Sequence, residues 1–500
     1  MTSPPQWSRR RFLFTSAQTT AGLFLSPLRT PTARAASAFG YSFERVVEGI
    51  VRSQGRGVGS VSITDGYGVH RTASDGTFRF SADPRARFVY VSLPAGYRIP
   101  TNPRGTGRFY RSLPHTSAAM EVTFELESLT ESDENHHFLL LADVQTENAE
   151  ETALFRSTTI PEVRSWADHT PGEKFGVACG DIMFNHLELF PTYEEAVSET
   201  GIPFFQVVGN HDLDRDEWVD VASTRTFEQF FGPPYYSFNR GAVHYIVLDD
   251  IFWYGGGYIG YIDADQLNWL KEDLATVEPG RLVIVMLHIP LASTQHKRVG
   301  QDRPSPSGIV MNRAVLYRLL EPYQAHVLSA HTHENEHLFE GGIHEQVHGA
   351  VCGAWWTGPV CYDGTPCGYG VYEVRGEELR WRYQSTGFGS EHQMRLYRPG
   401  ELSTYPDHVV ANVWNFDPQW SVRAFSDRGE ELDVTSCPAP DPLSIRLHQG
   451  PDLPPKRSWI EPRLNYHMFC CRVSQETRSV QFEVTDRFGE VYRERLQLHT

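Results

Sequence analysis

Short stretches of alternating polar and apolar residues occur between residues 41 and 128. Clear examples are residues 59–64, 77–80 and 88–93, which are separated by Asp-Gly and proline turns. Alternation with period two and frequent turn residues are typical of half-buried strands. We therefore predict a small β-sandwich over residues 41–128. The acidic stretch 125–134 that follows is predicted to be a linker.

From residue 137 onward the pattern changes, because short apolar runs now alternate with segments of helical periodicity. Helices are predicted at 263–274 and 312–320, with Asp263 or Asp265 as the N-cap of the first. Buried strands are predicted at 138–142, 175–179, 203–208, 243–248, 282–287 and 326–329. This alternation predicts an α/β domain over residues 135–390, with mixed β sheets flanked by helices.

The last part of the chain returns to a strand-like composition. Residues 480–484 alternate polar and apolar side chains, a turn follows at 486–489, and residues 491–496 resume the strand pattern. We predict a second β domain over residues 396–500. The length of 500 residues agrees with this division, since a domain takes about 150 residues.

Polar residues of the kinds that bind metals follow the predicted strands of the α/β domain. They occur in the segments Asp143-Val144-Gln145, Gly180-Asp181, Gly209-Asn210-His211-Asp212, Leu287-His288 and Ala330-His331-Thr332-His333. Open α/β sheets place their functional sites in the loops beyond the carboxyl ends of the strands. We therefore expect these segments to meet at one edge of the domain.

Together these segments supply the ligands for two divalent metal ions held side by side. Two ions at short separation need a shared ligand, and the two oxygens of Asp181 make it the candidate bridge. Asp143 and His333 would bind one ion. The other would be bound by Asn210, His288 and His331. A metal-bound hydroxide could then attack phosphorus, which makes hydrolysis of a phosphate ester the leading hypothesis.

At these residues the chain resembles the calcineurin-like metallophosphoesterase family, over about residues 135–385. The flanking β regions resemble those of a bacterial exported branch of the family. Four of the family's blocks match at the ligand positions, with two departures: Gln145 stands where the pattern has His, and Ala330 where it has Gly. Phe184 stands where the purple iron phosphatases of the family have Tyr, so the resemblance implies no purple colour.

The resemblance also implies roles for residues beside the ligands. His211 would lie near the leaving-group oxygen and assist its departure as a general acid. Asp212 would either orient the His211 ring or cap its own loop. Trp355 and Trp356 would either stack on a ring of the substrate or pack together in the core.

The identity of the two divalent ions stays open between Mn, Fe and Zn. Gln145 would coordinate through an oxygen, which favours Mn or Mg, whereas imidazole suits Zn and Fe. Other histidines have no assigned partner in the pattern and are predicted not to be ligands. These are His136, His137, His337, His344 and His348.

The formal charge of −17 opposes binding of a nucleic acid duplex, so the expected partner is a small phosphate ester. Residues 1–35 resemble a twin-arginine export signal, with Arg9 and Arg10 before an apolar stretch and Ala33-Arg34-Ala35 as a cleavage site. An ordinary Sec signal is the alternative. Either signal predicts a periplasmic or secreted protein, and no segment is long and apolar enough to be a transmembrane helix.

Seven cysteines are too few to form a disulfide scaffold in a chain of this length. Cys361 and Cys367 flank a turn and could pair or stay free, and Cys179 is predicted to lie in the core. An alternative function is a non-catalytic exported protein that binds the cell envelope through its β domains and has a degenerate metal site. Hydrolysis of a sulfate ester is a further alternative. Monoester or diester specificity and the oligomeric state stay open.

Overall fold

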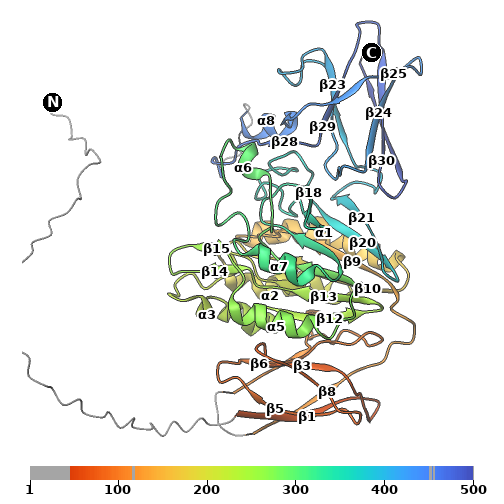
Figure 1. Ribbon diagram of the computed structural model, residues 1–500. Coiled ribbons are helices and arrows are strands. Elements are labelled where there is room, and N and C mark those ends of the chain that lie inside the picture. Colours follow the sequence, from red (N-terminus) through yellow and green to blue (C-terminus); the bar gives the residue numbers. More distant parts are fainter. Residues whose placement is uncertain (1–44, 115–118, 450–452, 454–456, 499–500) are drawn as a thin grey trace, which may run out of the picture. The chain divides into compact units, whose positions relative to one another are not determined.

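The computed structural model describes residues 45–114, 119–449, 453 and 457–498 (Figure 1). The predicted export signal at residues 1–35 lies outside these ranges and stays a prediction. The described residues form one unit by their internal contacts. In the part of the chain that the structure describes, no helix combines the length and the apolar character needed to cross a membrane.

The first described region consists of two four-stranded sheets, as the alternating pattern predicted. In β5, Phe78, Phe80 and Ala82 are buried while the residues between them are exposed. One sheet contains β1 (Arg45–Ser53), β2 (Arg56–Gly57), β5 (Thr77–Ala82) and β8 (Met120–Glu125). The other contains β3 (Ser62–Thr64), β4 (Val69–Arg71), β6 (Phe88–Val91) and β7 (Tyr110–Ser112).

The central α/β region contains two larger mixed sheets. The five-stranded sheet has the order β11 (Phe204–Val207), β10 (Glu173–Cys179), β9 (Asn135–Leu141), β20 (Gly368–Arg375) and β21 (Glu378–Ser385). The six-stranded sheet has the order β12 (Tyr236–Arg240), β13 (Val243–Val247), β16 (Leu282–Met286), β17 (Gln324–Ser329), β19 (Ile343–Val347) and β18 (Glu336–Glu340). Strands β9, β10 and β11 are mutually parallel, and so are β13, β16, β17 and β19.

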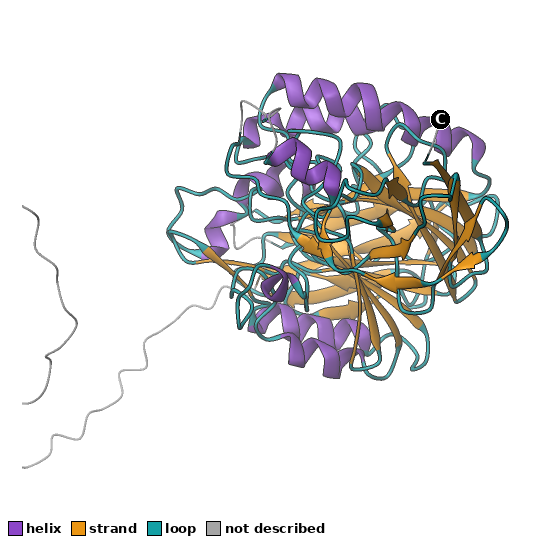
Figure 2. Ribbon diagram, turned by 90° about the horizontal axis from the view of Figure 1, so that it is seen from above, coloured by secondary structure: helices purple, strands orange, loops and turns teal. Residues whose placement is uncertain are grey.

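The two sheets pack face to face, with helices on their outer faces (Figure 2). Between the sheets, the ring of Tyr245 lies 5.6 Å from that of Phe138 and 5.3 Å from that of Phe175, both edge-on. The alternate residues Leu139 and Leu141 belong to the core shared with the helices. These helices are α1 (Ala149–His169), α2 (Phe190–Ser198), α4 (Arg225–Phe231), α5 (Ala264–Leu274) and α7 (Arg313–Leu320).

The six strands and two helices predicted in this region are all present, with ends shifted by at most a few residues. Asp263 is the N-cap of α5, since its Oδ1 accepts a hydrogen bond of 2.7 Å from the Gln266 N–H. Helix α1 was not predicted, because its buried face mixes Phe155 and Ile160 with polar residues and the helix contains Pro161. Its N-cap Asn148 accepts from the Glu151 N–H at 3.0 Å.

The last region again forms two four-stranded sheets. The predicted hairpin is present, and Val480, Phe482 and Val484 are buried in its core. One sheet contains β22 (Arg395–Tyr397), β23 (His408–Asn412), β29 (Met468–Arg472) and β26 (Val434–Ser436). The other contains β25 (Glu431–Leu432), β24 (Ser421–Ser426), β30 (Ser479–Thr485) and β31 (Val491–Gln497). Short connecting elements are η1 (Leu187–Leu189), α3 (Asp220–Ser223), β14 (Ile251–Trp253), β15 (Tyr258–Gly260), α6 (Gln295–Arg298), β27 (Ala439–Pro440), α8 (Pro442–His448) and β28 (Leu464–Asn465).

The acidic stretch predicted as a linker is packed against the domains that it connects, since Leu126 is buried and the Leu129 N–H donates to the Gly96 carbonyl at 2.8 Å. Asp133 is buried and lies 3.3 Å from the Arg240 guanidinium, whose side chain is also buried. All seven cysteines are free thiols, so Cys361 and Cys367 follow the unpaired alternative. Cys179 is fully buried, as predicted.

Candidate metal centre

Each predicted ligand lies just beyond the carboxyl end of a strand. Asp143 follows β9, Asp181 follows β10 and Asn210 follows β11. On the facing sheet, His288 follows β16, and His331 and His333 follow β17. Because parallel strands end at a common edge, the packing of the two sheets brings these loops together.

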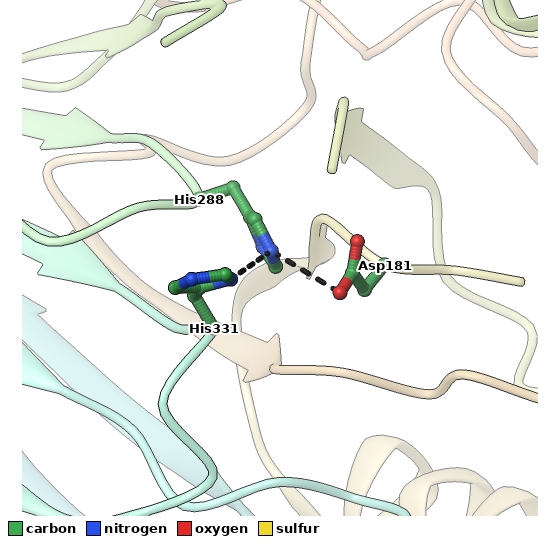
Figure 3. Close-up of side chains that lie close together, drawn as sticks. All are labelled: Asp181, His288 and His331. Atoms are coloured by element: carbon green, nitrogen blue, oxygen red, sulfur yellow. Dashed lines mark hydrogen bonds and ion pairs between the residues drawn. The ribbon is translucent and has the colours of Figure 1, made fainter. Parts of the chain in front are cut away.

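Three of these side chains converge on one point, as Figure 3 shows. The Nε2 atom of His288 lies 3.3 Å from Oδ2 of Asp181 and 3.2 Å from Nδ1 of His331. These three residues form a group whose ligand atoms could hold one metal ion. The Asn210 amide oxygen lies 3.2 Å from the same His288 nitrogen. The four residues predicted for this ion are therefore together.

The remaining predicted ligands form a second group, which contacts Asp181 through Gln145. Asp143 Oδ1 is 3.4 Å from Nε2 of His333. The Gln145 amide nitrogen donates to Asp181 Oδ2 at 3.0 Å, and its oxygen faces the Cys352 thiol. Gln145 is thus adjacent to the predicted bridge. A coordinating Gln145 would have to turn its amide oxygen toward the ion.

The residues present fit a pair of cations. Asp143 and Asp181 are buried, and Asp143 Oδ1 has no hydrogen-bond donor among the described groups. A buried carboxylate oxygen without a partner is costly unless a cation binds it. Burial lowers the pKa of His288, but the charges of Asp181 and Asp143 outweigh it and raise the pKa to about 10. The same two carboxylates would attract a bound cation.

The backbone at the site adopts an uncommon conformation. Eleven non-glycine residues in the described chain have positive φ, and seven of them are predicted site residues. These are Asp143, Gln145, Asp181, His331, His333, Trp355 and Trp356, with φ between 47° and 71°. Each such residue costs on the order of 1 kcal/mol, and strain of this kind is concentrated at functional sites.

Two glycines allow the loops to approach each other. A Cβ at Gly180 would lie 2.3 Å from Nδ1 of His288, and a Cβ at Gly209 would lie 2.0 Å from the Asp181 nitrogen. The glycines that precede Asp181 and Asn210 are therefore required for close packing. The sequence pattern contains both glycines, but it does not predict this packing role.

Backbone carbonyls orient two of the imidazoles. His288 Nδ1 lies 3.0 Å from the Cys179 carbonyl oxygen, and His333 Nδ1 lies 2.6 Å from that of Gly353. Each contact places the proton on Nδ1 and leaves Nε2 for a metal, as is usual for metal-binding histidines. The Nε2 atoms are indeed the ones that face Asp181 and Asp143.

His211 lies next to this centre but is oriented by a residue that the sequence analysis missed. Its Nδ1 is 2.8 Å from Oδ1 of Asn185, and the Arg215 guanidinium donates to the same oxygen at 2.6 Å. The ring stacks on Phe184 at 4.5 Å. The backbone N–H of His211 donates to Oδ1 of Asp181, the predicted bridging residue, at 2.8 Å.

The prediction that Asp212 orients the His211 ring is wrong. Both oxygens of the buried Asp212 accept backbone N–H groups, from Ile182 at 3.1 Å, Met183 at 3.0 Å and Gly209 at 3.0 Å. Asp212 therefore caps the two loops that carry Asp181 and Asn210, which was the alternative. Burial and the charge of Asp181 raise the pKa of Asp212 to about 8.

Trp355 and Trp356 are both half-buried beside the centre. The Trp355 ring stacks on His333 at 4.2 Å, whereas the Trp356 indole N–H donates to the Val144 carbonyl at 3.1 Å. Arg457, which belongs to the last region of the chain, also lies beside Trp355. Its guanidinium donates to the Trp355 carbonyl and to Glu147 Oε2, the latter at 2.8 Å.

No local pattern in the sequence marks Asn185, Arg215 or Arg457 as site residues. Asn185 comes four residues after Asp181 and has a positive φ of 66°, which only the fold reveals. Arg457 lies more than a hundred residues beyond the last predicted site residue. A sequence signal for it would need knowledge of which regions of the chain touch.

The five histidines predicted not to be ligands contact residues other than the predicted ligands. His136 contacts the Asp133 carbonyl and the Tyr245 hydroxyl, and His348 contacts the Ser329 carbonyl and the Tyr372 hydroxyl. His137 lies 3.8 Å from Glu373. His337 and His344 lie together, with 3.0 Å between their nitrogens, and His326 packs on His344 with ring centroids 5.4 Å apart.

The cluster of His326, His337 and His344 predicts a loss of stability in acid. Burial, followed by the charge of Arg487, lowers the pKa of His326 to about 4, and burial also lowers the pKa of the other two. Because unfolded histidine takes up a proton near pH 6.5, unfolding binds protons below that pH. The contribution of His326 to the free energy of unfolding should be nearly constant above about pH 7.5 and should fall by roughly 2 kcal/mol by pH 5.

Urea denaturation at pH 8 and pH 5 measures this loss. A His326→Phe variant should lose about 2 kcal/mol less than the wild type over that interval. A His186→Phe variant is the matched control, because His186 is exposed. An equal pH dependence in the wild type and His326→Phe would contradict the assignment.

Models of one family match three successive parts of the chain. They are described as the N terminal of calcineurin-like phosphoesterase at residues 45–129, calcineurin-like phosphoesterase at 136–335, and the C terminal of calcineurin-like phosphoesterase at 345–492. The central match contains the six ligands from Asp143 to His333, together with Gln145. The other two matches contain the sandwich that precedes it and the β region that follows it.

Curated relatives match shorter stretches. Purple acid phosphatase 15 of Arabidopsis thaliana is 34% identical over 15% of this chain and 15% of its own length. Serine/threonine-protein phosphatase CPPED1 of Mus musculus is 30% identical over 24% of this chain and 41% of its own length. A cAMP/cGMP dual specificity phosphodiesterase of Mycobacterium tuberculosis is 28% identical over 32% and 46%. The chain thus spans less than half of each of these relatives.

Two solved structures are similar to about half of this chain. The purple acid phosphatase PPD1 from yellow lupin has a TM-score of 0.37 and 11% identity, covering 50% of this chain and 51% of that chain. The 5'-nucleotidase precursor from Thermus thermophilus has a TM-score of 0.30 and 12% identity, covering 50% and 54%.

Proposed function

Because the chain belongs to the calcineurin-like phosphoesterase family, we propose that it hydrolyses phosphate esters at a centre of two divalent metal ions. The observation that carries the proposal is the convergence of the buried carboxylates Asp143 and Asp181 with imidazoles from the facing sheet. The convergence of the six other ligand residues argues against the alternative of a degenerate, non-catalytic site, in favour of which only Gln145 speaks. Esters of phosphoric acid also agree with the activities named for the similar proteins.

The residues divide into two sets that share Asp181. Asp143, Gln145 and His333 would complete the site of one ion, and Asn210, His288 and His331 would complete the site of the other. When bound, such a pair neutralises the charge on the phosphoryl group and makes a nucleophile available near neutral pH. The protein holds the ligands in place through the backbone contacts of His288 and His333.

His211 would assist the leaving group. The hydrogen bond to Asn185 places the proton of the neutral ring on Nδ1, which leaves Nε2 to hold a second proton for the departing oxygen. Arg215 shares the Asn185 oxygen and so restrains the amide that orients the ring. The Phe184 ring covers one face of the imidazole.

A panel of phosphate monoesters and diesters, assayed with Mn, Zn or Fe after chelation, tests the function. We expect hydrolysis only when metal is restored, with a maximum near two ions per chain. A sulfate ester belongs in the same panel. Full activity in the metal-free protein, or cleavage of the sulfate ester alone, would overturn the proposal.

Replacing Gln145 by His should change the metal preference. We propose that Gln145 makes the Asp143 ion the more weakly held one, since an amide oxygen is a harder and weaker ligand than imidazole. The wild type should then respond best to Mn, and Gln145→His should bind this ion more tightly and prefer Zn or Fe. Metal titration of both proteins after chelation measures the difference. Identical titrations would mean that Gln145 acts only through its hydrogen bond to Asp181.

A further inference from the structure

Two of the metal-ligand histidines each contact an aromatic ring on the wall of the site. The ring of His331 meets that of Tyr258 edge-on at 6.1 Å, and the ring of His333 stacks on Trp355 at 4.2 Å. Tyr258 and Trp355 in turn contact segments that contain exposed aromatic side chains. The site is therefore bordered by apolar groups on two sides.

The first border consists of the β14–β15 hairpin and the segment that contains Trp218. Tyr258 pairs with Trp253 across the hairpin, and the Tyr254 N–H donates to the Gly257 carbonyl at 3.0 Å. Tyr254 is 59% exposed and Trp218 is 84% exposed. They belong to one surface, because a Cβ at Gly255 would lie 2.9 Å from the Trp218 carbonyl oxygen. Further exposed apolar side chains nearby are Val219, Val221 and Met311.

Hydrogen bonds hold this surface in place. The Trp253 backbone N–H donates to Asp220 at 2.6 Å, and its indole N–H donates to the Glu217 carbonyl at 2.7 Å. The Met311 N–H donates to the Gly260 carbonyl at 2.7 Å. The exposed side chains are thus displayed by an ordered backbone.

The second border is built by the last region of the chain. Trp459 is 54% exposed and its ring lies 4.6 Å from that of Trp355. Arg457, in the same segment, forms ion pairs with Glu147 at 2.8 Å and Glu151 at 3.1 Å. Both acids follow shortly after Gln145 in the chain. Segments with exposed tryptophans are therefore connected to the ligands His331 and His333, through Tyr258 on one side and Trp355 on the other.

Single exposed tryptophans are common on protein surfaces and need no explanation. Several apolar side chains grouped at a functional site mark a binding surface. In the described segment around Trp218, the acids Asp216, Glu217 and Asp220 outnumber Arg215 and Arg225, and Arg225 pairs with Glu217 at 3.7 Å. The chain as a whole has a formal charge of −17. Such a surface repels strongly anionic assemblies. It suits the uncharged hydrocarbon portion of a ligand.

We propose that the substrate is a phosphate ester of a long apolar alcohol, presented in an assembly of neutral or zwitterionic amphiphiles. This inference rests on the proposed function. The phosphoryl group would lie at the metal centre, and the hydrocarbon portion would lie against Trp218 and Tyr254 on one side and Trp459 on the other. A soluble sugar or nucleotide phosphate would leave these side chains in water.

Two diesters with the same leaving group test the proposal: 4-nitrophenyl ethyl phosphate in solution and 4-nitrophenyl dodecyl phosphate in non-ionic detergent micelles. Because the same bond breaks in both, their kcat/KM ratio reports contacts to the chain. The wild type should prefer the dodecyl ester by about tenfold or more. The Trp218→Ser, Tyr254→Ser double variant, and separately Trp459→Ser, should lower that preference by about tenfold.

The ethyl ester should be hydrolysed by all variants within about twofold of the wild type, which excludes a general loss of structure. Phe388→Ser is the matched control, because Phe388 is 51% exposed and its ring stacks on His392, away from the centre. Equal use of both esters by the wild type, or an unchanged preference in the variants, would overturn the inference and leave the proposed function standing. Failure to hydrolyse either ester with any metal would count against the function itself.

Discussion

Asp181→Asn should lose most of both metal ions and nearly all activity. Asp181 contacts side chains of both ligand sets, His288 and Gln145, and also accepts the backbone N–H of His211. The substitution removes a full negative charge while keeping the shape of the side chain. Because a metal pair contributes several kcal/mol to catalysis, the rate should fall by roughly 10³-fold or more.

Elemental analysis and steady-state kinetics of the same preparation measure both effects. Asp168→Asn is the matched control, because Asp168 is an exposed acid on α1 that pairs with Arg164 at 2.9 Å. It should keep its metal and its activity. An Asp181→Asn protein with unchanged metal content would remove Asp181 from the bridging position.

His211→Ala should lower turnover while leaving the metal content nearly intact. His211 lies beside the centre, but its ring contacts Asn185 and Phe184 and none of the predicted ligand side chains. Proton transfer from a positioned side chain contributes about 10²–10⁴-fold. The loss should reach this range for alkyl esters, whose alkoxides are poor leaving groups.

For nitrophenyl esters the loss should be much smaller, since that leaving group needs little protonation. Asn185→Ala should resemble His211→Ala in its dependence on the leaving group, but with a smaller loss. Equal losses for alkyl and nitrophenyl esters would show that His211 positions the phosphoryl group and does not supply a proton. His186→Ala, an exposed neighbour in sequence, should change neither class of ester.

The patterns of apolar residues predicted the strands well, because those strands are buried and flanked by turns. Runs such as 138–142 and 282–287 contain few polar residues, so their identity as core strands is evident from local composition. Helix α1 was not predicted because its buried face includes Glu151, Thr152 and Thr159. The side chains of Glu151 and Thr152 form hydrogen bonds with other residues of the protein. Periodicity alone cannot recognise a polar residue that is satisfied in this way.

The sequence by itself determined the types of the ligands, their order and their position after strands, and hence the family and the expected chemistry. These properties are local, since each depends on a run of a few residues. Only the tertiary structure decided which neighbour orients His211, because Asn185 and Asp212 both lie close to the motifs along the chain. It also decided that Arg457 and Trp459 lie beside the centre, since contacts between regions more than a hundred residues apart depend on how the sheets pack. Side-chain packing between distant loops, and not any local preference, sets those distances.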